Sequence, residues 1–287
     1  MSVSGFSHVN INCRDIARSL PFYSDVLGLR VAKQFPERHD TGALVGLESP
    51  HSNMVAVLSP GRGRSSIELI EWRLPDQPPE PGVPAGSRLA GVAHLVFEVP
   101  DVDVVHDAAR NAGYRCAWAD GEHRLLQIEG PDGSVQVTPG TEGTLLGALV
   151  DVVDLDASLR CYVDALGLTS GDTSESAPAT GPGYRQVDVV VPAAVSPFVI
   201  TLREYVDGKT EAVQQRRADT PGFLRLAFFD DDVAGAHDRA VEMGSKTLSP
   251  PDFFDFGSLT AHAALWFDVD GVLIEVLSFG SNPSPRS

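Results

Sequence analysis

Two histidines and a pair of glutamates are the residues of this chain whose types and settings could do chemistry. His8 lies in "SHVNINC", His94 lies in "GVAHLVFEV", and Glu68 and Glu71 lie in "SSIELIEW". Successive side chains of a strand point to opposite faces, so Glu68 and Glu71 cannot both reach one ion. Two imidazoles with one carboxylate suit Fe²⁺, Mn²⁺, Zn²⁺, Ni²⁺ or Co²⁺. The residues therefore predict a divalent-metal site, provided that the fold brings the three segments together.

The alternation of polar and apolar residues indicates which side chains share a face. In the first segment His8 and Asn10 alternate with the apolar residues Val9 and Ile11. A strand with this pattern buries its apolar face, so the polar face is expected to line a cleft. Asn10 is then a candidate substrate-binding residue beside His8.

Long-range repeats show which elements must position these residues. "FYSDVLGL" at 22–29 recurs as "CYVDALGL" at 161–168, an offset of 139 residues (161 − 22). "GVAHLVFEVPDVDVVHDAARNAGYR" from Gly91 resembles "GFLRLAFFDDDVAGAHDRAVEMGSK" from Gly222, an offset of 131 residues (222 − 91). Repeats at a long fixed period indicate a duplicated structural unit. Each copy reads as a strand, a helix and further strands, so we expect four β-α-β-β-β units.

Proline, glycine and polar residues separate the units. The stretch 73–88, "RLPDQPPEPGVPAGSR", is too rich in proline and glycine for a helix or a central strand. The expected organisation is a first half, a second half and a tail: 1–140 with units 1–72 and 89–140, 141–280 with units 145–207 and 220–279, and 281–287.

Composition limits the class of protein. The net charge of −17 argues against a nucleic-acid or anionic-membrane partner. The three cysteines lack zinc or redox spacing, and no stretch of about 18 apolar residues exists, so we expect a cytoplasmic protein. A monomer or a homodimer is compatible with this composition.

Taken together, the motifs resemble the vicinal oxygen chelate superfamily, which includes glyoxalase I, extradiol dioxygenases and bleomycin-resistance proteins. The resemblance rests on the four units, the "FY…DVLGL" helix end, the strand that begins Gly-x-x-His, and the "PDG" hairpin. It implies an α+β fold in which four βαβββ modules form two half-barrel domains. It also implies a divalent metal inside a half-barrel, held by first and last strands.

The resemblance selects Glu68 over Glu71 as the carboxylate ligand beside His8 and His94. Its usual fourth ligand is a glutamate four residues after the hairpin glycine, where this chain has Val137. Strand alternation points Gln136 at the cleft instead, as a weaker ligand. Alternatively the position is open for substrate and O₂.

The second half retains less of the implied site. The equivalents of His8, His94 and Glu68 are Gly147, Arg225 and Thr201, whereas Glu275 is kept. Arg225 and Glu275 are expected to form an ion pair in place of the metal. The working site is therefore predicted within 1–140. If the first unit pairs with the fourth instead, His8, Glu68 and Glu275 meet, and His94 lies in another cleft.

The predicted function is that of a metal-dependent vicinal-oxygen-chelate enzyme acting on a small oxygenated metabolite, with dioxygenase or lyase/isomerase chemistry. The ion would act as a Lewis acid and a carboxylate as base. The alternative is a metal-free protein of the same fold that binds a ligand or sequesters an antibiotic. The candidate residues are Glu68, Glu98 and His123 for catalysis, Asn10, Trp72, Arg225 and Tyr184 for substrate binding, and His8, Glu68, His94 and Gln136 for the metal.

Overall fold

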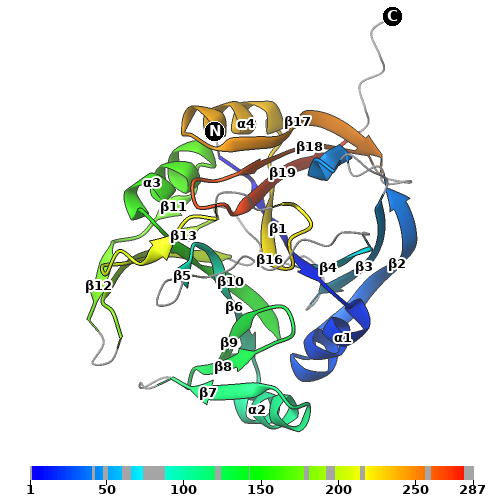
Figure 1. Cartoon of the computed structure of the whole chain (residues 1–287), viewed down its shortest axis with the longest axis vertical. Coiled ribbons are helices and arrows are strands. Elements are labelled where there is room, and N and C mark those ends of the chain that lie inside the picture. The colour runs from blue at the N-terminus through cyan, green and yellow to red at the C-terminus, as the bar shows by residue number, and fades with distance from the viewer. Residues whose placement is uncertain are drawn as a thin grey trace, which may run out of the picture.

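A computed structural model of the chain shows two large β-sheets packed against each other, with four α-helices around them in the described part (Figure 1). It describes residues 2–40, 43–47, 51–59, 66–73, 88–119, 124–141, 143–177, 181–191, 198–213, 217–255 and 260–280. This arrangement confirms the predicted α+β fold with two half-barrel sheets.

The first sheet is built from the first and the last units of the chain. Its strand order is β17-β18-β19-β16-β1-β4-β3-β2. At its centre β1 pairs antiparallel with β16 and parallel with β4, while β16 pairs parallel with β19. The strands are β1 (Gly5–Cys13), β2 (Arg30–Asp40), β3 (His51–Ser59), β4 (Ser66–Arg73), β16 (Gly222–Phe229), β17 (Lys246–Asp255), β18 (Thr260–Phe267) and β19 (Leu273–Phe279).

The second sheet is built from the two middle units. Its order is β11-β13-β14-β10-β6-β9-β8-β7, with β12 beside β13. The strands are β6 (Gly91–Val99), β7 (Arg115–Trp118), β8 (Leu126–Glu129), β9 (Ser134–Pro139), β10 (Thr144–Val152), β11 (Thr169–Ser170), β12 (Ser174–Ser176), β13 (Tyr184–Val190) and β14 (Val199–Tyr205). A short ribbon joins β5 (Arg88–Leu89) to β15 (Thr210–Glu211).

The pairing of the units therefore differs from the one favoured by the sequence. The first unit shares a sheet with the fourth and the second with the third, so the expected pairing within 1–140 is wrong. The physical reason lies in the connections. The connection between β9 and β10 consists only of residues 140–143, so the third unit stays beside the second. The connection between β4 and β5, residues 74–87, is long enough to reach from one sheet to the other.

Each helix begins at an aspartate that recurs with the repeats. The N-caps Asp15, Asp101, Asp154 and Asp232 accept hydrogen bonds from backbone N–H groups of the first turn, which stabilises the helix start. The helices are α1 (Ile16–Pro21), α2 (Val102–Asn111), α3 (Leu155–Leu159) and α4 (Val233–Glu242), with π-helical turns at η1 (Phe22–Val26) and η3 (Arg160–Ala165) and a 3-10 turn at η2 (Ala43–Val45). None of the helices in the described part is long and apolar enough to cross a membrane.

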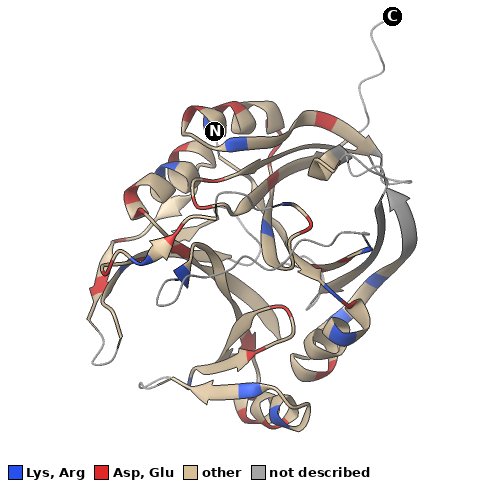
Figure 2. Ribbon diagram, viewed as in Figure 1, with Lys and Arg blue, Asp and Glu red and all other residues tan. Residues whose placement is uncertain are grey.

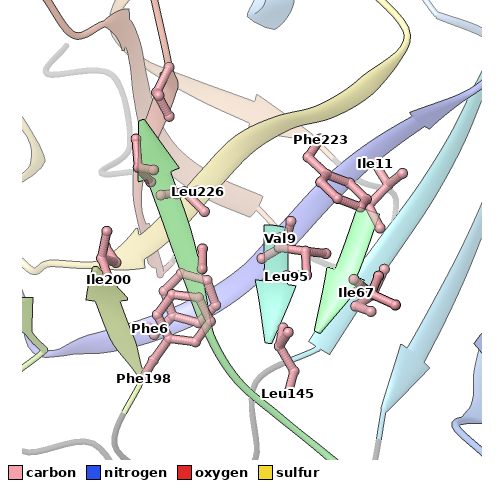
Figure 3. Close-up of a cluster of buried hydrophobic side chains, with 14 of the residues drawn as sticks. Phe6, Val9, Ile11, Ile67, Leu95, Leu145, Phe198, Ile200, Phe223 and Leu226 are labelled. Atoms are coloured by element: carbon pink, nitrogen blue, oxygen red, sulfur yellow. The ribbon is translucent and has the colours of Figure 1, made fainter. Parts of the chain in front are cut away.

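The two sheets bury their apolar faces against each other. Val9 of β1 and Leu95 of β6 are fully buried in one hydrophobic cluster (Figure 3). Phe6 stacks on Phe198 of the other sheet with ring centroids 3.5 Å apart. Burial of each such side chain contributes about 1.5–3 kcal/mol. Charged residues lie mainly on the helices, the connecting segments and the strand ends (Figure 2). The polar face of each sheet consequently points away from the shared core.

Neighbouring units are joined by contacts between a helix and a hairpin. Asp132, in the turn between β8 and β9, accepts hydrogen bonds from Ser19 Oγ at 2.8 Å and Tyr23 OH at 3.4 Å. In the other half, Asp270 accepts from Ser158 Oγ and Asp268 accepts from Tyr162 OH. The first unit is thus fastened to the second and the third to the fourth. Burial raises the pKa of Asp132 to about 6, against the two hydrogen bonds that lower it.

Asp132→Asn is expected to flatten the pH dependence of stability. Because the folded-state pKa lies above the ordinary value of 3.8, the folded protein binds the proton more tightly. The contribution of Asp132 to the free energy of unfolding therefore falls by roughly 3 kcal/mol as the pH rises from about 4 to about 7. Urea unfolding of parent and variant across this window measures the difference. The control Asp164→Asn, at an exposed position, should keep the parental profile. A parental profile in Asp132→Asn would contradict this account.

Candidate functional site

Four charged side chains meet on the face of the first sheet that points away from the core. They are His8 on β1, Glu68 on β4, Arg225 on β16 and Glu275 on β19, named here the charge cluster. The Nε2 atom of His8 lies 3.6 Å from Oε2 of Glu68 and 3.6 Å from Oε2 of Glu275. The central strands β1 and β16 and their parallel partners β4 and β19 supply one residue each. The pairing of these four strands therefore brings the cluster together.

The guanidinium of Arg225 lies between the two carboxylates of the cluster. Its Nε atom is 3.1 Å from Oε2 of Glu275, and its Nη2 atom is 3.8 Å from Oε2 of Glu68. Nε also donates to Oδ1 of Asn10 at 2.5 Å. Asn10 is fully buried and donates in turn to Oε2 of Glu68 at 2.5 Å. Asn10 therefore ties the arginine to the glutamate rather than standing free for a ligand.

Burial makes the charges in the cluster depend on one another. The side chains of Arg225 and Glu275 are 8% and 7% exposed, whereas that of Glu68 is 27% exposed. Burial lowers the pKa of His8, but Glu68 and Glu275 outweigh it and the net shift is upward. Burial raises the pKa of Glu275, but Arg225 and His8 outweigh it and the net shift is downward. With His8 protonated, two positive and two negative charges balance.

The donor types suit a divalent ion, but the arrangement does not fit one. Nε2 of His8 and Oε2 of Glu275 are buried without an aligned hydrogen bond, as ligand atoms would be. However, the guanidinium already contacts both carboxylates. Two like unit charges about 4 Å apart repel by about 4 kcal/mol at an effective dielectric constant of about 20. Among the described residues, no group of three His, Cys, Asp or Glu side chains is arranged to hold a metal ion. A resident divalent ion is therefore not accommodated beside Arg225.

The other predicted metal ligands lie elsewhere. His94 on β6 and Gln136 on β9 belong to the second sheet. Their side chains and that of His8 lie on opposite sides of the shared core, because Val9 and Leu95, the neighbours of the histidines, fill it. The prediction that His8, Glu68, His94 and Gln136 share one ion is therefore wrong. The physical reason is that β1 pairs with β16 and not with β6.

The remaining candidates are divided between the two sheets. Glu98 belongs to the second sheet, where its carboxylate accepts from the backbone N–H of Thr141 at 3.0 Å. Tyr184 is in the same sheet, with its ring against Tyr205. His123 lies outside the described residues. Glu98 and Tyr184 therefore lie in the other sheet from the charge cluster.

A small cavity lies beside the charge cluster. Its polar lining residues are Arg225, Asn10 and Asn12, and its apolar ones include Trp72, Ile70 and Leu224. The cavity has room for about one water molecule. Trp72, a candidate substrate-binding residue from the sequence, lines this cavity. Leu224 and Leu273 also line the cavity and were missed, because nothing in the sequence distinguishes an apolar cavity residue from a core residue.

Asn12 holds the cavity wall in place and was also missed as a site residue. Its Oδ1 accepts from Nε1 of Trp72 at 3.0 Å, and its Nδ2 donates to the carbonyls of Ala218 and Thr220 at 2.8 Å each. Val45 of η2 packs in the same buried cluster as Trp72. The only signal in the sequence was that Asn12 shares a strand face with His8 and Asn10.

His8 and His94 are expected to titrate on opposite sides of the ordinary histidine pKa of 6.5. The carboxylates of the cluster raise the pKa of His8, whereas burial and then Arg203 lower that of His94. Stability contributed by His8 is present below pH 6.5 and is lost as the pH rises through the folded-state pKa. NMR titration of the ring protons, assigned with His8→Gln and His94→Gln, measures both. A lower value for His8 than for His94 would contradict the cluster.

Comparisons with known proteins agree with this architecture. The family model described as Glyoxalase/Bleomycin resistance protein/Dioxygenase superfamily matches residues 5–135 and 145–276. Glyoxalase I from Zea mays is similar in structure, with a TM-score of 0.70, 16% identity, and coverage of 96% of this chain and 92% of that chain. A putative dioxygenase from Bacillus subtilis has a TM-score of 0.62 and 14% identity, with coverage of 98% and 87%. A search of curated proteins finds no match.

The structural neighbours share the fold at low sequence identity, so they do not identify a reaction for this chain. The family model covers most of both halves, in agreement with the repeats and with the two half-barrel sheets. The chain therefore belongs to the Glyoxalase/Bleomycin resistance protein/Dioxygenase superfamily.

Proposed function

We propose that this chain acts on a small oxygenated compound at the charge cluster, and that Arg225 supplies the positive charge for the reaction. The observation that carries the proposal is the buried guanidinium of Arg225 beside the partly exposed carboxylate of Glu68. A fixed cation in a water-poor site stabilises an oxyanion far better than it does in water.

The size of the cavity suggests how the compound is oriented. The cavity has room for about one water-sized group, so it admits only the carbonyl oxygen, which accepts a hydrogen bond from Arg225. Asn12 keeps the indole of Trp72 in the cavity wall through the hydrogen bond to Nε1. The rest of the compound lies over the charge cluster beside Glu68, the partly exposed carboxylate.

Glu68 is the proposed base, because it is the most exposed carboxylate of the cluster. It takes a proton from the carbon next to the carbonyl, and the electron pair of that C–H bond moves to the carbonyl oxygen as an enolate. Arg225 stabilises the enolate oxygen together with protonated His8. The proton on Glu68 exchanges with solvent, and its return to a different carbon or face completes an isomerase-type reaction.

A metal-dependent reaction, as predicted from the sequence, is not part of this proposal. The reason is the position of Arg225 between Glu68 and Glu275, where the guanidinium contacts both of the carboxylates that a cation would need. Glu275 serves here as a fixed anion that orients Arg225.

A metal-free ligand-binding function is the second candidate. Glu68 is partly exposed, and the chain carries a net charge of −17, so the site would attract a cationic compound. In that case the compound binds and dissociates without a proton exchange. This reading corresponds to the sequestering protein considered from the sequence.

We further propose that the protein works in a reducing compartment and is active as a monomer. Cys13, Cys116 and Cys161 are unpaired, which supports a reducing compartment such as the cytoplasm. All four members of the cluster come from one chain, which supports an active monomer.

Glu68→Gln is expected to abolish the proposed proton transfer. NMR in D₂O would follow deuterium incorporation into a panel of small hydroxyaldehydes, hydroxyketones and dicarbonyl compounds, using protein treated with chelator. Loss of a positioned base lowers the rate by about 10²- to 10⁴-fold. The control Glu98→Gln changes a glutamate of the other sheet and should keep the parental rate.

Two results would count against the proposal. Exchange that depends on added divalent metal and is lost in His8→Ala would indicate a metal-dependent reaction. Binding of a compound from the panel without any exchange would favour the ligand-binding function instead.

A further inference from the structure

We infer that η2 is a displaceable cap beside the charge cluster, and that the apolar group of a bound compound takes the place of its Leu44 side chain. The inference rests on the proposed function for the position of the compound. It adds the class of compound, one that carries a flat apolar group, such as a phenyl ring, next to its carbonyl carbon.

The cap belongs to the first unit but lies against the fourth. It contacts β17 and β18, beside which it is drawn as a short blue helix (Figure 1). Val45 is buried and lines the cavity next to Arg225. Leu44 packs on two apolar clusters, one that contains Trp72 and one that contains Ala227. The cap therefore reaches from the cavity to the sheet face next to the charge cluster.

The sheet face under the cap is apolar and continuous with the charge cluster. Ala227 pairs in register with both His8 and Glu275, so it stands in the same row of the sheet. In the next row Leu277 pairs with Ala263. These three apolar residues, named here the alanine floor, are at most 3% exposed. The side chains packed against them are Leu44, Phe229 and Phe254.

The small side chains of the alanine floor suit a flat ligand group. Ala227 lies two residues beyond Arg225 on β16, so a compound whose oxygen meets the guanidinium can reach the floor with the neighbouring group. A phenyl ring that replaces Leu44 there keeps apolar surface covered. The exchange of one apolar group for the other therefore costs little free energy.

The cap is held less firmly than the core under the sheet. Its leucines, Leu44 and Leu47, are only partly buried, as is Leu248 of β17 beside them. Apolar contacts that remove less area from water contribute less stability. Gly46, directly after η2, has a φ of +66° and passes close to β17, because a β-carbon there would lie 2.7 Å from Cδ1 of Leu248.

The experiment measures binding of phenacyl alcohol and hydroxyacetone by calorimetry to the full-length parent and to Leu44→Ala. The variant weakens the closed position of the cap, so it is expected to bind phenacyl alcohol about 10-fold more tightly than the parent. Hydroxyacetone carries a methyl group in place of the phenyl group and should bind both proteins equally. The control Leu20→Ala truncates a partly buried leucine of α1 and should keep both parental affinities.

A disulfide between positions 46 and 248 tests the displacement itself. A β-carbon at position 46 would lie 3.3 Å from Cγ of Leu248, so the sulfur atoms of Gly46→Cys and Leu248→Cys are close enough to bond. Cys116→Ser is added, because Cys116 is partly exposed while Cys13 and Cys161 are buried. The oxidised protein should bind phenacyl alcohol at least about 10-fold more weakly than the same protein after reduction. Its affinity for hydroxyacetone should not change.

Two results would overturn the inference. One is failure of folded Leu44→Ala to bind phenacyl alcohol more tightly than the parent, with Leu44→Val taking its place if Leu44→Ala does not fold. The other is equal binding of phenacyl alcohol by the oxidised and reduced forms of the disulfide variant. Binding that follows both expectations without deuterium exchange would support the cap and contradict the proposed reaction, so the two fail separately.

Discussion

The structure of the site depends on one constraint, the need for a cation between the buried carboxylate of Glu275 and the partly exposed carboxylate of Glu68. Removing an ion from water costs several kcal/mol, and the partner charge offsets this only at close range and with good geometry. Arg225 meets that need by contacting Glu275 at 3.1 Å and Glu68 at 3.8 Å. Asn10 completes the arrangement by bonding to both the arginine and Glu68.

Formation of the charge cluster also requires a particular pairing of strands. Four strands must lie in fixed register for the cluster to form, and two of them come from each end of the chain. A hydrogen bond from α1 to Asp132 holds the first unit to the second. A hydrogen bond from α3 to Asp270 holds the third unit to the fourth. Sheet pairing and helix docking thus link all four units, and a slip in any unit would separate the charges.

Local features of this fold could be predicted from the sequence. The repeats predict a helix in each unit, and each of these helices is present with an aspartate at its N-cap. Gly28 and Gly167 of the repeated Leu-Gly-Leu take the left-handed conformation after the first and third of them. The alternation around His8 correctly placed Asn10 on its face. These features depend on residues that are close in the chain, where backbone geometry is decisive.

The partners across the sheets could not be predicted in the same way. His8 and His94 each follow a glycine by three positions on the first strand of their unit, and the pairing of distant strands places them in different sheets. The ion pair of Arg225 with Glu275 was expected, but in a half of the protein considered degenerate. That His8 and Glu68 join this pair follows from the pairing of the first unit with the fourth, which the sequence left open as an alternative.

Membership of the superfamily therefore describes the scaffold better than the site. This chain shares its fold with glyoxalase I from Zea mays at 16% identity. In the proposed site the positive charge belongs to a side chain of the protein, Arg225. Such a cation is always present, cannot be removed by chelators, and is fixed in position by its neighbours.

The most direct test of this central claim is a double-mutant cycle of Arg225→Met and Glu275→Gln, measured by urea unfolding. If the arginine neutralises the buried glutamate, each single variant loses several kcal/mol, and the double variant loses less than the sum, with a coupling energy of about 2 kcal/mol or more. Additivity within about 0.5 kcal/mol would contradict the account.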